Sequence, residues 1–147
     1  MRTFVKEIDV AAPTERVWEV MTDLDRWPEW TLSVSSVKRL GNKPFAIGTK
    51  VLVRQPGLPP AVWKISSIES GRSFTWVSSA PGIHVTATHS AVPVPGGSRI
   101  TLRLEYQGFV GELFARLTEK ITDRYMNYEA EGLKARSENP AFVTNRN

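Results

Sequence analysis

The sequence predicts an α+β fold: a curved antiparallel sheet of about seven strands on a long C-terminal helix, with two short helices between the first two strands. Three observations predict it. After residue 33 the spacing of apolar residues changes from about four to two, and alternating segments follow one another. Short links rich in Gly, Pro and Asn separate these segments, which favours antiparallel neighbours. Helical spacing then returns from about residue 110 to 137.

The first elements are a strand and two short helices. A strand is expected at residues 3–10, which carry apolar residues in partial alternation. Pro13 suits the first position of a helix, because its missing N–H would have no partner there. The apolar face of that helix is Val17, Trp18, Met21 and Leu24. Asp25 is expected to cap a second helix through Trp30, which Pro28 limits to a turn or two.

The remaining strands are expected at residues 34–40, 49–54, 62–69, 73–78, 83–92 and 99–106. The last of them alternates most regularly. Its inward set is Ile100, Leu102, Leu104 and Tyr106. Its other face carries polar and charged residues, so one face of the sheet is expected to pack inward and the other to meet water.

A single long helix is expected at residues 110–137. Its apolar stripe is predicted to be Val110, Leu113, Phe114, Leu117, Ile121, Tyr125 and Tyr128, at steps of three and four. Glu129 is assigned to the charged, outer face. Gly132 and Ala135 are expected to permit close approach of another element. Residues 1–138 are predicted to form one domain, and residues 139–147 a C-terminal tail.

Composition excludes several classes of protein. The 147 residues contain no Cys, which rules out a disulfide scaffold, Cys-ligated zinc and a thiol nucleophile. The net charge of +4 comes from scattered basic residues without a polybasic run, so no nucleic-acid partner is expected. No apolar run approaches the roughly 20 residues of a transmembrane helix, and the N-terminus lacks the apolar stretch of a signal peptide. We therefore expect a soluble cytoplasmic protein, as a monomer or homodimer.

Several short motifs connect the chain to a known family. They are the segment 8–13 leading into 17–23, the Trp-Pro-Glu-Trp run at 27–30, Ile-Gly-Thr at 47–49, and residues 96–102 before Gly108. With these motifs the chain resembles the START/Bet v 1-like (SRPBCC) superfamily, most closely its polyketide cyclase/dehydrase and lipid-transport-like branch. The resemblance implies the helix-grip arrangement, with a deep cavity between sheet and helix. It also implies a lipid, steroid or aromatic polyketide-like ligand, and in some members cyclisation or dehydration.

Large rings are the main candidates for the wall of such a cavity. The chain has five Trp, spread over four of the expected elements. The predicted ligand-binding residues are Trp18, Trp30, Leu58, Trp63, Trp76, His89, Tyr106, Phe114, Leu117 and Tyr125. The alternative for each ring is ordinary core packing. Leu58 lies in a proline-rich hairpin that either rims the cavity mouth or is only a rigid surface turn.

His89 is the one candidate catalytic residue. In the strand at 83–92 it shares a face with Val85, Ala87 and Ala91, so its side chain is expected to point inward, and that of His84 outward. It is either a buried structural histidine or a general acid/base, and a positioned histidine contributes roughly 10²–10⁴ in rate. No metal site and no cofactor are expected.

Three functions remain open. The first is binding of a small hydrophobic molecule in an internal cavity. The second is a cyclase/dehydratase-type enzyme in which His89 is the acid/base. The third is a partner-binding role in which side chains fill the cavity.

Overall fold

The computed structural model describes residues 1–139, so the predicted tail at 139–147 lies outside the described residues except for Asn139. The elements are β1 (Arg2–Val10), α1 (Thr14–Thr22), the 3₁₀ helix η1 (Leu24–Arg26), α2 (Trp27–Trp30), β2 (Ser36–Leu40), β3 (Lys50–Arg54), β4 (Ala61–Glu69), β5 (Ser73–Ala80), β6 (Ile83–Val94), β7 (Gly97–Gln107), α3 (Phe109–Leu117) and α4 (Glu119–Glu138). All seven strands fall where the alternation predicts them. Their ends differ by at most two residues.

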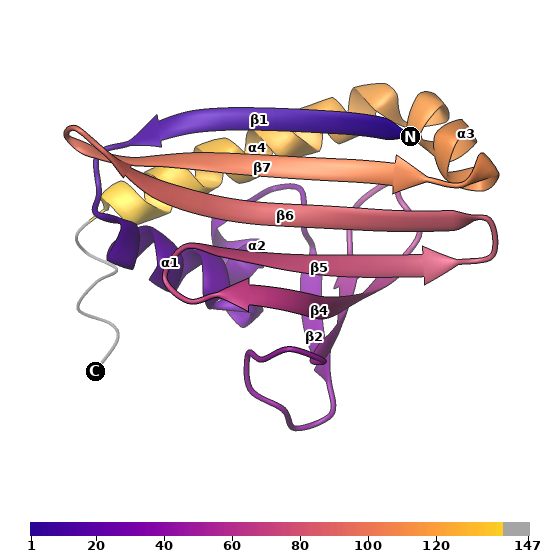
Figure 1. Ribbon diagram of the computed structural model, residues 1–147, viewed down its shortest axis with the longest axis horizontal. Helices are drawn as coiled ribbons and strands as arrows, with labels where there is room; N and C mark the ends of the chain where they lie inside the picture. The colour runs from indigo at the N-terminus through magenta and orange to yellow at the C-terminus, as the bar shows by residue number, and fades with distance from the viewer. Residues whose placement is uncertain (140–147) are drawn as a thin grey trace.

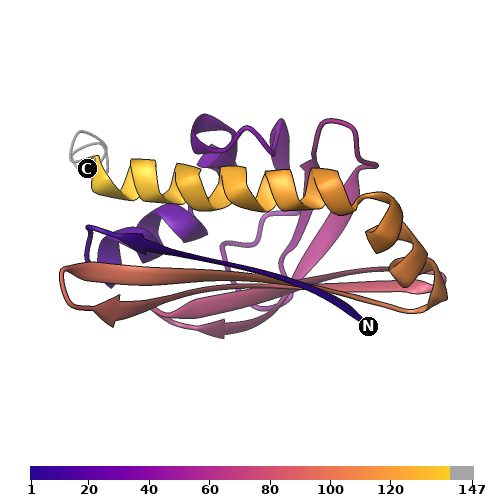
Figure 2. The ribbon, with the colours of Figure 1, turned by 90° about the horizontal axis from the view of Figure 1, so that it is seen from above.

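The strands form one antiparallel sheet in the order β1-β7-β6-β5-β4-β3-β2 (Figure 1). The first strand pairs with the last, from Arg2 opposite Tyr106 to Val10 opposite Ser98. The sheet bends, and a register shift between Ile65 and Ser67 places a bulge in β4, where such an extra residue increases local twist. All helices lie on one side of the sheet, and α4 crosses that side (Figure 2). This is the predicted helix-grip arrangement.

The C-terminal helix is not continuous, contrary to expectation. It breaks at Thr118, whose backbone (φ −108°, ψ 15°) leaves the helical region between α3 and α4. The Thr118 hydroxyl donates a hydrogen bond to the Phe114 carbonyl at 2.7 Å, an arrangement that bends helices. The break lets α3 fold down beside the ends of β6 and β7 while α4 spans the sheet.

The break also changes which helical residues face inward. The predicted stripe is wrong for most of its members: Leu117 is 76% exposed and Leu113 is 50% exposed. The buried positions are instead Gly111, Ala115, Thr122, Met126, Ala130, Leu133 and Ser137. Small side chains dominate this face because the helices lie close to their neighbours. Ala135 is exposed and takes no part.

Gly132 makes the closest approach on α4. A Cβ atom placed there would lie 1.9 Å from the carbonyl oxygen of Trp30, so only glycine lets α2 lie against α4. The prediction of a close approach at Gly132 is therefore confirmed. It fixes the position of the short helix that carries Trp27.

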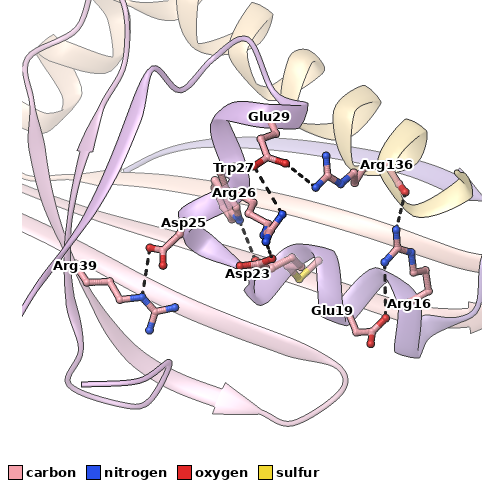
Figure 3. A network of polar contacts seen from close by, with 10 residues as sticks. Arg16, Glu19, Asp23, Asp25, Arg26, Trp27, Glu29, Arg39 and Arg136 are labelled. Atoms are coloured by element: carbon pink, nitrogen blue, oxygen red, sulfur yellow. Dashed lines mark hydrogen bonds and ion pairs between the residues drawn. The ribbon is translucent and has the colours of Figure 1, made fainter. Parts of the chain in front are cut away.

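A polar network also joins α1, α2 and α4 (Figure 3). Arg136 of α4 donates to Glu29 of α2 at 2.8 Å, and the buried Arg16 of α1 donates to the carbonyl of Arg136 at 3.2 Å.

Asp25 is not a helix cap, contrary to expectation. It lies inside η1, and its carboxylate accepts a hydrogen bond from Arg39 of β2 at 3.4 Å. Pro13 is the residue before α1 rather than its first member.

No helix within residues 1–139 is long and apolar enough to cross a membrane.

Candidate functional site

A cavity lies between the inner face of the sheet, α2 and α4. Its volume is ≈ 100 Å³. The residues that line it are Trp27, Ser33, Val34, Val53, Gln55, Leu58, Trp63, Trp76, Ala87, His89, Leu104, Tyr106, Thr122, Tyr125, Met126 and Glu129. This space holds several water molecules or a small chemical group, and is below the roughly 300–1,000 Å³ of sites for drug-sized ligands.

Three indole rings occupy much of the interior and explain the small volume. Trp63 of β4 stacks on Trp76 of β5, with ring centroids 5.6 Å apart and planes at 30°. Trp27 of α2 tilts onto Trp76 at 5.3 Å. We call Trp27, Trp63 and Trp76 the indole cluster. Trp27 is held in place because its Nε1–H donates to the Met21 carbonyl at 3.0 Å.

His89 faces the cavity from β6, as its strand position predicts, and is only 4% exposed. Its ring stacks on Phe74, directly opposite on β5, with centroids 4.4 Å apart and planes at 9°. Its Nε2 lies 3.2 Å from Oε1 of Glu129. Its Nδ1 is buried and has no hydrogen-bond partner among the described residues.

Glu129 reaches the cavity from α4. Its side chain is 17% exposed, and its Oε1 is buried, close to His89 but not aligned for a hydrogen bond with any described residue. Its assignment to the outer face of the helix is therefore wrong. The stripe drawn from residue 110 onward runs on through Tyr125 and Tyr128, whereas the buried face after the break contains 122, 126, 130 and 133. Glu129 borders that face.

Tyr106 and Thr122 form the other polar part of the wall. Burial raises the pKa of the Tyr106 phenol, and a hydrogen bond with the Thr122 hydroxyl opposes that rise. Tyr106 therefore stays neutral at physiological pH and presents a hydroxyl rather than a charge.

The loop between β3 and β4 forms part of the cavity wall. Leu58 and Gln55 of this loop line the cavity, and the Tyr125 hydroxyl of α4 donates a hydrogen bond to the Pro56 carbonyl. Gly57 lies against Ile121 of α4. The loop is thus held against α4 beside the cavity.

Six of the ten predicted ligand-binding residues line the cavity: Leu58, Trp63, Trp76, His89, Tyr106 and Tyr125. The other four do not. Trp18 packs on the edge of Phe45, Trp30 on the outside of Trp27, and Phe114 on Tyr106. Leu117 faces away because the helix breaks after it.

Sequence reasoning missed two important members of the site, Trp27 and Glu129. Trp27 is in the Trp-Pro-Glu-Trp run, and its partner Trp30 was chosen in its place. Periodicity does not decide between two rings in one short turn. The sequence feature that indicates Glu129 is its spacing from Met126 and Leu133. In a helix that begins after Thr118, this spacing places Glu129 beside the buried face.

Comparison with known families matches residues 1–138 to the model of the family described as polyketide cyclase / dehydrase and lipid transport. The chain belongs to that family. The match spans the predicted domain and agrees with the resemblance found in the sequence. A comparison with curated proteins gave no match.

Solved structures show the same fold. The Zhui aromatase/cyclase from Streptomyces sp. R1128 is 15% identical, with a TM-score of 0.76 and 93% of each chain covered. A norcoclaurine synthase mutant from Thalictrum flavum is 18% identical, with a TM-score of 0.73, covering 92% of this chain and 93% of that one. Ara h 8.0201 is 18% identical, with a TM-score of 0.62, covering 90% and 97%. At these identities the likeness establishes a Bet v 1-like helix-grip fold for this family member.

Proposed function

We propose that this protein binds a small hydrophobic molecule in the cavity between its sheet and α4. The observation that carries the proposal is a ≈ 100 Å³ cavity walled by indole and phenol rings. The family, which includes lipid transport, supports the same class of ligand.

The size of the cavity limits the affinity. An apolar ligand that buries roughly 300 Å² gains about 7 kcal/mol at ~25 cal/mol/Å². The observed space takes only a small ligand or one end of a larger one, and association consumes several kcal/mol. We therefore expect affinities that are micromolar or weaker, unless the indole cluster rearranges.

Thermal unfolding with neutral aromatic probes of rising size, from toluene to naphthalene to anthracene, tests the proposal. A ligand at 100 times its Kd stabilises the folded state by about 2.7 kcal/mol, so binding raises Tm. Ala87→Leu fills the cavity from β6 and should weaken binding of toluene at least tenfold. Thr86→Leu, the neighbour on the other face of β6, is the control. Absence of any Tm rise, with no molecule retained in native mass spectrometry, would refute the proposal.

Leu58 is proposed as part of the mouth of the cavity. Leu58→Asp places a charge at the opening and should weaken binding of the same probes. An unchanged affinity would leave the loop as a rigid surface hairpin.

A second candidate is a cyclase/dehydratase-type enzyme, and the observation that favours it is the contact of His89 with Glu129 at 3.2 Å. A carboxylate close to an imidazole stabilises the imidazolium that forms when the ring accepts a proton. His89→Ala should then abolish cyclisation of a linear poly-β-ketone analogue, measured by absorbance of the aromatic product, while retaining its binding. Equal rates for the two proteins would mean that His89 is structural.

A further inference from the structure

We propose that the molecule bound in this cavity carries a compact organic cation, a quaternary or protonated ammonium group, which enters the space between the indole cluster and Glu129. This inference rests on the proposed function, because it requires that the cavity be a binding site, and it names the chemical class of the ligand.

The charges at the cavity point to a cation. Among the lining residues within 1–139, Glu129 is the only acid and there is no Lys or Arg. A carboxylate or phosphate ligand would therefore meet Glu129 without an opposing guanidinium or ammonium. An ammonium ligand, in contrast, meets a carboxylate whose buried Oε1 has no hydrogen-bond partner among the described residues. Buried charge is tolerated when it is paired in this way.

The rings of the wall point the same way. Five aromatic side chains line the cavity besides His89: Trp27, Trp63, Trp76, Tyr106 and Tyr125. Indole and phenol faces carry negative quadrupole charge and attract cations within about 6 Å, most strongly when water is excluded. Trp27 and Trp76 are only 3% and 4% exposed, so their faces toward the cavity are shielded from bulk water. Sets of such rings, known as aromatic cages, recognise quaternary ammonium groups.

The volume agrees with a compact group. With the indole cluster in its present arrangement, a space of ≈ 100 Å³ is too small for a whole steroid or aromatic polyketide, but it suits a group of a few heavy atoms such as a trimethylammonium. The remainder of a longer ligand would leave past Leu58 at the mouth. The neutral Tyr106 hydroxyl adds a polar partner without adding charge.

His89 is the one group that competes for Glu129. Its Nε2 lies 3.2 Å from the carboxylate, and no other basic side chain lines the cavity in the described part of the chain. A bound cation therefore shares the Glu129 carboxylate with the imidazole. A substitution of Glu129 is for this reason the variant that tests the proposal.

The test compares three molecules of nearly the same shape: choline, its neutral isostere 3,3-dimethyl-1-butanol, and the anion 3,3-dimethylbutanoate. Their affinities are measured by NMR titration of the indole N–H signals. We expect choline to bind at least tenfold more tightly than the neutral alcohol, and the anion to bind most weakly. Glu129→Gln should reduce choline affinity at least tenfold and leave the alcohol unchanged. Glu131→Gln, on the exposed face of the same helix, is the matched control.

The outcomes separate this inference from the proposed function. If the neutral alcohol binds as tightly as choline, the cation inference is wrong while hydrophobic binding stands. If none of the three molecules nor the apolar probes binds, both are wrong. The comparison of choline with its isostere uses the unaltered protein, so it decides the question even if Glu129→Gln does not fold.

Discussion

Replacing Gly132 by alanine gives the sharpest test of how α2 is held against α4. In a helix interior this change ordinarily stabilises by about 1 kcal/mol. Here the new Cβ atom would lie 1.9 Å from the Trp30 carbonyl oxygen and 2.9 Å from its carbon. The obstacle is backbone, so the helices must separate by more than an ångström. Overpacking of this kind costs about 1–3 kcal/mol or more. We expect net destabilisation of about 2 kcal/mol, lowering Tm by roughly 4–8 °C.

Thermal unfolding followed by circular dichroism and by tryptophan fluorescence measures this effect. Gly111→Ala in α3 is the matched control, because its Cβ would lie no closer than 3.4 Å to Ile83. That variant should be neutral or slightly stabilised. Gly132→Ala should also shift the emission of the folded state, since Trp27 and Trp30 lie on the displaced helix. If Gly132→Ala stabilises the protein as much as Gly111→Ala does, α2 does not lie where the structure places it.

Two further predictions concern the C-terminal helices. Leu133→Ala should destabilise by about 2–5 kcal/mol because Leu133 is fully buried, whereas Leu117→Ala should stay within about 0.5 kcal/mol; equal effects in urea unfolding would contradict the assignment of the buried face. The hydrogen bond from Lys134, aided by the Ala11 N–H, holds the pKa of Glu138 below its usual value of 4.5. The stabilisation that Glu138 provides is complete above that pH and is lost as the pH falls through the lower, folded-state pKa. Glu138→Gln should therefore lose less stability than the unaltered protein between pH 6 and pH 3.5, and an identical loss would argue against it.

The strands were predictable because each depends on alternation and short turns that are local in the sequence. The same reasoning predicts the orientation of His89. Its side chain is on the same face of the strand as Ala87 and Ala91, and all three are buried in the structure. The C-terminal helix was less predictable. Its apolar spacing continues through Thr118, so nothing in the periodicity marks the break that turns Leu117 outward and brings Glu129 inward.

The sequence by itself determined the order of the elements, the inward faces of the strands and the membership of the family, because these follow from local spacing and motifs. Only the tertiary structure decided the content of the interior. Whether an aromatic ring fills the interior or lines the cavity depends on how closely α2 and α4 approach each other. Gly132 sets this distance through its contact with Trp30, about a hundred residues away in the sequence. For that reason the cavity is small, Trp27 rather than Trp30 lines it, and a carboxylate stands opposite His89.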